Sequence, residues 1–343
     1  MMPPPRPARS WRRTPRSTRP DPVATTEGAT ASVARTTRKA AKGSSKSVGA
    51  SHAGALTPYL FMAPYLILFA IFVLAPLVSA LWISLHNWDY LLPGKPFTGL
   101  DNYTDLFSGT GTAGLFWQSM SATAQFTLYS VPPLVLLPLG VAIVLNQKIP
   151  GQKVFRAIYF APYVLGVAVV GILWRYLLDP SVGLINYYLG RIGFSGDLPW
   201  TNGLPWAWIG LVGATVWWTL GFNTIIYLAG LQGIPRDLYE AARVDGANNW
   251  QAFRNVTLPQ LRPVILFVTT VTILASANVF GQSYLITQGA PGGDTRTAIM
   301  YITDEGLGRF RMGSAAAMSI ILAAALAIIG ALNFRFLGKG DDY

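Results

Sequence analysis

Residues 234–259 read IPRDLYEAARVDGANNWQAFRNVTLP, a polar stretch that separates two long apolar segments. Gly246 ends a first short helix, because glycine accepts the positive φ that a helix C-terminus often adopts. Asn248 or Asn249 can cap a second helix with its side-chain oxygen. Pro259 is expected to stop that second helix before the next apolar segment. The stretch therefore predicts a short helix, a glycine elbow and a second short helix.

The apolar segments on either side belong to a set of six, each long enough to cross a bilayer as a helix. Segments of this length exclude a β-barrel, whose strands would be about ten residues long with strict alternation. With 52% hydrophobic and only 12% charged residues, the chain has too little charge to cover a soluble protein of 343 residues. The sequence predicts an all-α integral membrane protein with transmembrane helices at residues 59–85, 121–145, 157–178, 206–231, 264–286 and 314–336.

The sequence lacks the residues needed for proton pumping, metal binding and nucleotide binding. No Asp, Glu or Lys interrupts a predicted span, which argues against a proton pump with a titratable relay inside the membrane. The chain has no cysteine and two histidines, so no metal site is expected. The sequence also contains no G-x-x-x-x-G-K-[ST] loop for binding a nucleotide.

The positive charge is concentrated at the N-terminus. Residues 1–58 hold 11 of the 26 Lys and Arg residues and only two acids, in a stretch rich in Pro, Ser, Thr and Ala. This composition predicts a disordered cytosolic tail, and without a folded platform or interleaved aromatic residues it does not predict nucleic-acid binding. With this terminus in the cytosol, the inner segments hold 20 basic residues and the outer loops six, which predicts an N-in, C-in topology.

The polar stretch resembles the EAA loop of ABC importer permeases. Glu-Ala-Ala at 240–242 is followed by three residues, Gly246, nine residues and Val-Thr-Leu-Pro at 256–259, with valine where the family usually has isoleucine. The residues of this loop are similar to those of the carbohydrate-uptake branch of the family, which includes the maltose transporter. FTGLDNYTDLF at 97–107 and YLITQGAP at 284–291 are also similar to segments of that branch, although Gln288 and Ala290 depart from its pattern. The resemblance implies that the ATPase-coupling residues are Tyr239, Glu240, Ala241, Ala242, Asp245, Gly246, Phe253 and Pro259.

The resemblance implies a type I ABC importer permease fold. Residues 56–338 would form the six-span permease domain, with the cytosolic coupling loop at 233–262 and tails at 1–55 and 339–343. The implied partners are a second permease subunit, which would make a heterodimer, a cytosolic ABC ATPase dimer, an extracellular solute-binding lipoprotein and membrane lipid. The chain itself would bind no cofactor and would not be an enzyme, because the partner ATPase would use the ATP. Its expected location is the bacterial cytoplasmic membrane.

The fourth and fifth spans carry the polar and aromatic residues that a sugar path needs. Thr269, Thr272, Ser276 and Ser283 recur at helical spacing along the fifth span. Such hydroxyls can wet a cavity, but they also hold membrane helices together, and the sequence does not decide between the two uses. In the family these two spans line the translocation path. The expected path residues are Trp217, Trp218, Thr219, Asn223, Thr272, Ser276, Asn278 and Gln282.

The favoured function is therefore the permease subunit of an ATP-driven, binding-protein-dependent importer of sugars or oligosaccharides. One alternative is an ABC permease for a non-sugar solute such as a polyamine, phosphate or an amino acid. Another is a secondary transporter or a membrane enzyme. That last class would need buried catalytic or ion-coupling residues, and the spans show none.

Overall fold

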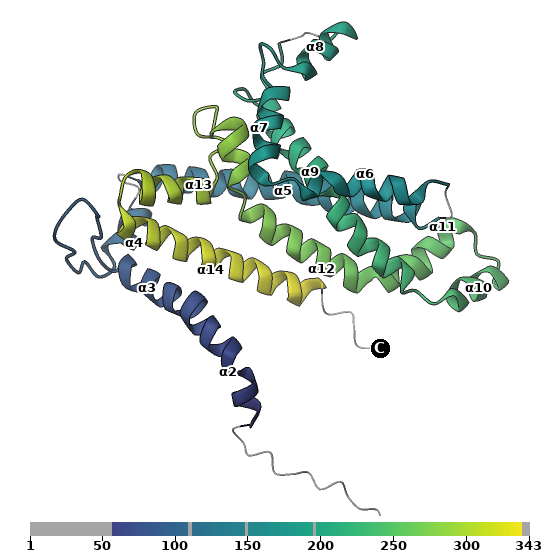
Figure 1. The fold of residues 1–343 in the computed structure, drawn as a ribbon, viewed down its shortest axis with the longest axis horizontal. Coiled ribbons are helices and arrows are strands. Elements are labelled where there is room, and N and C mark those ends of the chain that lie inside the picture. The colour runs from purple at the N-terminus through teal and green to yellow at the C-terminus, as the bar shows by residue number, and fades with distance from the viewer. Residues whose placement is uncertain (1–56, 109–111, 148–149, 195–196, 338–343) are drawn as a thin grey trace, which may run out of the picture. The chain divides into compact units, whose positions relative to one another are not determined.

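The computed structural model describes residues 57–108, 112–147, 150–194 and 197–337. The expected tails at 1–55 and 339–343 lie outside the described residues. The described residues form helices joined by loops, with two isolated β-bridges, His86–Phe97 and Asp89–Arg311 (Figure 1). The all-α prediction is confirmed.

Within the described ranges, five helices are long and apolar enough to cross a bilayer, and a bent pair of helices makes a sixth span. The first span runs through α2 (Thr57–Phe69), the π-helical turn η1 (Ala70–Leu74) and α3 (Ala75–Ser84). The others are α5 (Ala113–Leu145), the pair α6 (Gln152–Val164) and α7 (Val167–Leu177), α9 (Trp206–Gln232), the continuous run α11 (Asn249–Ala252), η2 (Phe253–Thr257) and α12 (Leu258–Ala277), and α14 (Met312–Leu337).

The third span is not the single helix that the sequence predicts. Its two halves, α6 and α7, meet at an angle of 97°. Leu165 and Gly166 between them are extended, with ψ values of 137° and 150°. The carbonyl of Leu165 accepts a hydrogen bond from the indole N–H of Trp218 at 3.0 Å, so a backbone group freed by the break is satisfied from α9. The break is thus built into the packing of α6 on α9.

The fifth span differs from the prediction at both ends. Pro259 does not stop the second loop helix, because it follows the π-helical turn η2, and a local π-helical adjustment accommodates a residue without an N–H. The helix therefore runs unbroken from Asn249 to Ala277 through η2. It ends nine residues before the predicted position, because the side chain of Asn278 donates to the carbonyl of Leu274 at 2.7 Å and ends the helical ladder. Residues 283–287 form the separate π-helical turn η3.

Short helices outside the spans escaped the sequence prediction. They are α4 (Asp101–Phe107), α8 (Leu184–Arg191), α13 (Ala298–Thr303) and the π-helical turn η4 (Asp304–Gly308). The second span also begins eight residues earlier than expected, at Ala113. These elements lack the long apolar run that marks a transmembrane helix, so hydropathy alone does not find them.

The core is formed by α5, α9 and α12, which pack on one another (Figure 1). One buried cluster joins Phe126 of α5 to Leu211 and Ala214 of α9. A second joins Tyr227 of α9 to Leu261 of α12. A third cluster, around Leu106, Phe116, Tyr301 and Met318, joins α4, α5, α13 and α14.

Successive spans run in opposite directions, so the loops predicted to be inside should lie together and apart from those predicted to be outside. The ends of α5, α6 and α9 and the start of α10 (Arg236–Val244) line one common pocket, so the loops predicted to be inside lie together. The bridge between Asp89 and Arg311 joins two loops that are predicted to be outside. The side that faces the cytosol stays a prediction.

Candidate functional site

A cavity of about 470 Å³ lies among α5, α6, α7, α9 and the end of α12. Most of the predicted path residues meet there: the lining includes Trp218, Thr219, Asn223, Thr272, Ser276, Asn278 and Gln282. None of the lining residues carries a charge. The cavity thus offers hydroxyl and amide groups, which can exchange hydrogen bonds with an uncharged polar solute.

Polar side chains of the cavity also bond across the helices. Asn223 donates to the carbonyl of Leu134 at 2.9 Å and lies 3.4 Å from the hydroxyl of Thr272. Ser130 donates to the hydroxyl of Ser276 at 3.0 Å. These bonds join α5, α9 and α12. The side chains of Asn223, Thr272 and Ser276 therefore hold the helices together and also line the cavity, which are the two roles that the sequence left open.

An aromatic wall completes the cavity. The rings of Tyr163 and Phe222 are stacked, with centroids 4.7 Å apart and an interplanar angle of 17°. Trp218 lies beside Tyr163, with a centroid distance of 6.3 Å. The sequence prediction missed Tyr163 and Phe222. Phe222 lies one helical turn after Trp218, and Tyr163 follows Pro162 just before the break in the third span, so both carried a detectable signal.

Gly221 allows the wall to form. A Cβ at this position would lie 2.2 Å from the carbonyl oxygen of Tyr159 and 2.7 Å from the Cα of Phe160. Only glycine lets the backbone of α6 approach α9 this closely. That approach brings Tyr163 of α6 against Phe222 of α9.

Three residues singled out from the sequence lie away from the cavity lining. Trp217 packs edge-to-face on Trp174 at 5.7 Å between centroids. Thr269 does not line the cavity, and Ser283 belongs to η3 after the helix has ended. The buried hydroxyl of Ser283 donates to the carbonyl of Thr295. The predicted stripe therefore contributes only Thr272 and Ser276.

The polar loop after α9 forms the predicted helix, elbow and helix. α10 ends at Val244, and Gly246 adopts φ = 78°. The amide of Ala247 donates to the carbonyl of Ala242 at 2.9 Å, which closes the end of the helix. Asn248, rather than Asn249, caps α11: its side chain accepts from the amide of Gln251 at 2.9 Å, and the Gln251 side chain accepts from the amide of Asn248 at 2.8 Å.

Tyr239 ties α10 to the start of the fifth span. Its hydroxyl lies 3.0 Å from the hydroxyl of Thr257 in η2, and its half-buried ring packs against the cluster around Tyr227 and Leu261. Glu240 and Asp245 are exposed. The loop is therefore packed onto the end of α9 and the start of the fifth span.

The other face of the loop is open. A shallow groove of about 460 Å³ lies between α10 and α11, lined by Leu238, Ala241, Ala242, Asp245, Gly246, Ala247, Gln251, Asn255 and Val256. Val244 is 87% exposed and Trp250 is 67% exposed, and the ring of Trp250 lies 5.5 Å from that of Phe253. Large apolar side chains exposed on a polar loop mark an interaction surface for a protein or for the membrane.

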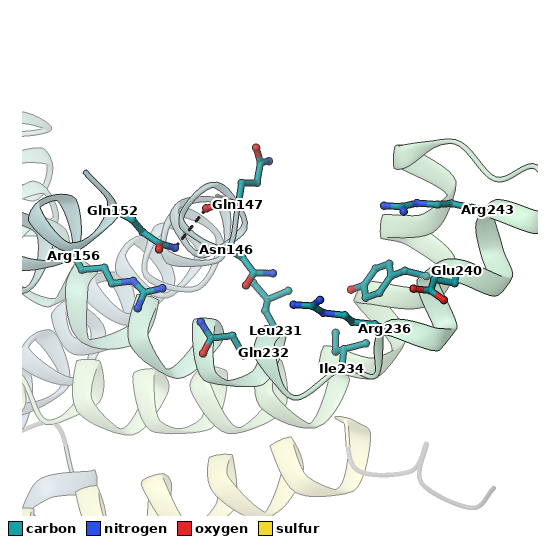
Figure 2. A pocket seen from close by; sticks show the side chains of 11 residues that line it. Asn146, Gln147, Gln152, Arg156, Leu231, Gln232, Ile234, Arg236, Glu240 and Arg243 are labelled. Carbon is teal, nitrogen blue, oxygen red and sulfur yellow. Dashed lines mark hydrogen bonds between the residues drawn. The ribbon is translucent and has the colours of Figure 1, made fainter. Parts of the chain in front are cut away.

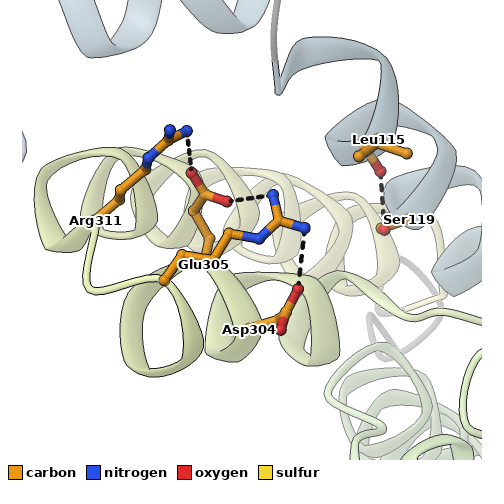
Figure 3. A network of polar contacts seen from close by, with 6 residues as sticks. Leu115, Ser119, Asp304, Glu305 and Arg311 are labelled. Atoms are coloured by element: carbon orange, nitrogen blue, oxygen red, sulfur yellow. Dashed lines mark hydrogen bonds and ion pairs between the residues drawn. The ribbon is translucent and has the colours of Figure 1, made fainter.

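A charged cluster fastens the loops at the opposite end of the spans (Figure 3). Glu305 of η4 is fully buried, and its carboxylate pairs with Arg309 at 3.2 Å and with Arg311 at 3.5 Å. Arg309 also pairs with Asp304 at 3.4 Å. The amide of Met312 donates to the carbonyl of Trp88 at 2.8 Å, so the cluster stands where α14 begins and the loop after α3 returns.

Residues 116–338 match the family described as binding-protein-dependent transport system inner membrane component. The chain belongs to this family. It is therefore a permease subunit that crosses the cytoplasmic membrane several times, and the match covers every span except the first.

Two relatives are similar along most of their length. The trehalose/maltose transport system permease protein MalF of Thermococcus litoralis is 35% identical over 273 residues, which cover 79% of this chain and 91% of that one. The arabinooligosaccharides transport system permease protein AraP of Bacillus subtilis is 33% identical over 290 residues, 83% of this chain and 90% of that one.

A solved structure supports the fold. A chain of a bacterial ABC transporter that imports the acidic polysaccharide alginate matches with a TM-score of 0.71 and 24% identity, over 83% of this chain and 96% of that chain. The similarity shows that the helices follow the arrangement of an ABC importer permease.

Proposed function

We propose that this chain forms half of the translocation pathway of an ATP-driven, binding-protein-dependent importer of oligosaccharides. The observation that carries the proposal is the cavity of uncharged polar groups beside the stacked rings of Tyr163 and Phe222. Sugars present hydroxyls at their edges and C–H groups on their faces, which match such a lining. The names of the two curated relatives, both transporters of oligosaccharides or disaccharides, agree with this substrate class.

The energy would come from a separate ATPase dimer, and this chain would bind no cofactor. The small side chains of Ala241 and Ala242 leave room for another surface to approach α10 closely, as a helix seated in a groove. A second permease subunit would supply the other half of the pathway, and an extracellular solute-binding protein would deliver the sugar. Closure of the ATPase dimer would move the loop, and through Tyr239 it would move α9 and α12.

The uncharged lining of the cavity argues against the alternative, charged solutes. A polyamine, phosphate or amino acid carries full charge, and burying that charge without a partner is costly. Among the described residues the cavity supplies no such partner. This favours a hydroxylated, uncharged solute.

Paired substitutions test the cavity. Ser276 lines it whereas its hydrogen-bond partner Ser130 does not, so Ser276→Ala and Ser130→Ala remove the same bond. If the cavity carries sugar, Ser276→Ala lowers the uptake rate or changes sugar preference beyond the effect of Ser130→Ala. Equal uptake and equal melting temperatures in the two variants would show that Ser276 only holds helices together.

The aromatic wall allows a second comparison. Phe222→Leu removes a ring from the cavity, and Trp217→Leu removes one outside it. Uptake per folded protein should fall several-fold in the first variant and stay near wild type in the second, because stacking on a sugar face needs the ring. A matching loss in both would contradict the stacking role.

A further inference from the structure

A second pocket, of about 740 Å³, lies where four helices end (Figure 2). The C-terminal ends of α5 and α9 and the N-terminal ends of α6 and α10 surround it. The pocket is separate from the cavity described above and shares no lining residue with it. Each of the three spans that border it has an end at the pocket, so we infer that the pocket lies at the level of the membrane surface.

The pocket gathers positive charge. Arg156 enters it from α6, and Arg236 and Arg243 enter it from α10. Glu240 is the one acidic residue of the lining, which leaves two net positive charges. Within the described part of the chain, no ion pair joins any of these arginines to a carboxylate. Three arginines that converge with a single carboxylate among them repel one another.

Arg156 provides a second, independent sign of a missing ligand. Its Nε is buried and has no hydrogen-bond partner among the described residues. A buried N–H of a charged group that lacks an acceptor costs free energy, so such groups are nearly always paired. In Figure 2 the guanidinium of Arg156 and that of Arg236 point into the same space from opposite walls.

The helix ends do not supply the missing charge. The N-terminal ends of α6 and α10 contribute partial positive charge, and the C-terminal ends of α5 and α9 contribute partial negative charge. These contributions oppose one another, so the arginine side chains decide the sign of the pocket. The amides of Asn146 and Gln232 add uncharged donors to the lining.

We propose that this pocket binds a phosphate group. The planar guanidinium presents paired N–H donors that match two phosphate oxygens, and two such groups from opposite walls can hold one phosphate between them. Basic pockets between the cytoplasmic ends of membrane helices are suited to the headgroups of anionic lipids. The same chemistry would take free inorganic phosphate. A phosphate here would link α6 to α10 and so stiffen the polar loop; the effect on ATPase coupling rests on the proposed function.

The test uses the full-length chain and two probes. Equilibrium dialysis with radiolabelled inorganic phosphate measures the free anion in detergent. Retention of phosphatidylglycerol through delipidation, measured by native mass spectrometry, measures the lipid. Arg156→Gln and Arg236→Gln should each weaken phosphate binding about tenfold, because a hydrogen bond to a charged group is lost. Arg156→Lys, which keeps the charge, should lose less.

Two matched controls carry the same charge change outside the pocket. Lys153 lies on α6 one turn from Arg156, and Arg254 lies in the same loop as Arg236; both are exposed and neither lines the pocket. Lys153→Gln and Arg254→Gln should leave binding unchanged. Melting temperatures without ligand identify any variant that fails to fold, and Arg243→Gln then replaces it.

Competition between the probes identifies the source of the phosphate. If phosphatidylglycerol displaces inorganic phosphate, the pocket takes a lipid headgroup; if only the free anion binds, it takes soluble phosphate. If neither probe shows saturable binding, the proposal is overturned. It is also overturned if Lys153→Gln weakens phosphate binding as much as Arg156→Gln does. Neither measurement requires transport, so a failed uptake assay would leave this result standing, and the reverse also holds.

Discussion

At the scale of single residues, Gly246 is the position where the loop depends most on backbone conformation. Its φ is 78°, and a Cβ there would meet no atom within 4 Å, so the constraint is conformational and not steric. Gly246→Val should cost about 1–2 kcal/mol locally and abolish uptake, whereas Gly246→Asn should retain most of it, because asparagine tolerates this conformation. Uptake and membrane content are measured together. Normal transport by the valine variant would refute the role of the elbow.

At Gly221 the constraint is steric and not conformational. An alanine there would overlap the backbone of Tyr159, so α6 would have to move away from α9. We expect Gly221→Ala to destabilise the protein by about 1–3 kcal/mol and to lower uptake, since the contact between Tyr163 and Phe222 would open. Gly213→Ala on the same helix, with no atom within 4 Å of its Cβ, is the control. Equal melting of the two variants would contradict the close approach.

Local rules predicted single residues well in the loop and less well in the spans. Gly246 and Asn248 follow from the preferences of helix ends, which depend on nearby sequence. Trp217 and Trp218 are adjacent, and only one can face the cavity. Which one does so depends on the rotation of α9 against α6, which packing sets and local sequence does not.

At the scale of elements, the contact between α10 and η2 should transmit motion from the loop to the spans. Tyr239→Phe and Thr257→Val each remove the bond between the two hydroxyls, which contributes about 1 kcal/mol. The double variant should be no less stable than the less stable single variant, because both substitutions break the same bond. Without this bond, the ATPase should still hydrolyse ATP, but hydrolysis should no longer drive uptake. Additive effects on melting would show that the bond is absent.

The cluster around Glu305 should fasten η4 to the start of α14. Arg309 and Arg311 are 43% and 59% exposed, so losing either one alone should cost about 1 kcal/mol or less. Losing both leaves a buried carboxylate without a cation, at a cost of about 3 kcal/mol, which exceeds the sum of the single losses. Adding Glu305→Gln to the double variant should restore part of the stability. Simple additivity in thermal melts would contradict the pairing.

Elements were predictable where hydropathy alone determines them. α9 and α14 are long apolar runs and appear close to the expected positions, and α5 ends at the expected residue. The break between α6 and α7 was not predictable from the apolar run of the third span, because the group that satisfies the carbonyl of Leu165, the indole of Trp218, comes from another helix. The end of α12 at Ala277 was missed for a related reason: residues 278–286 remain apolar enough to continue a span, although the side chain of Asn278 ends the helix.

At the scale of the whole molecule, the family assignment and the six spans describe a subunit that cannot work alone. The cavity reaches the end of α12, whereas the loop with exposed Val244 and Trp250 lies between the end of α9 and the start of the fifth span. Sequence predicted this organisation because the EAA-like loop is specific. It predicted neither the pairing of rings that forms the aromatic wall nor the arginine pocket, because each joins residues from separate helices.

The central claim is that this chain carries oligosaccharides across the membrane under the control of an ATPase. The most direct measurement is accumulation of a radiolabelled oligosaccharide in proteoliposomes that contain this chain, its second permease and the ATPase, with the binding protein supplied outside. We predict accumulation that requires ATP and the binding protein, falls in Phe222→Leu but not in Trp217→Leu, and is absent in Gly246→Val. Accumulation that persists without the ATPase, or an assembled complex that moves no sugar held by its binding protein, would contradict the account.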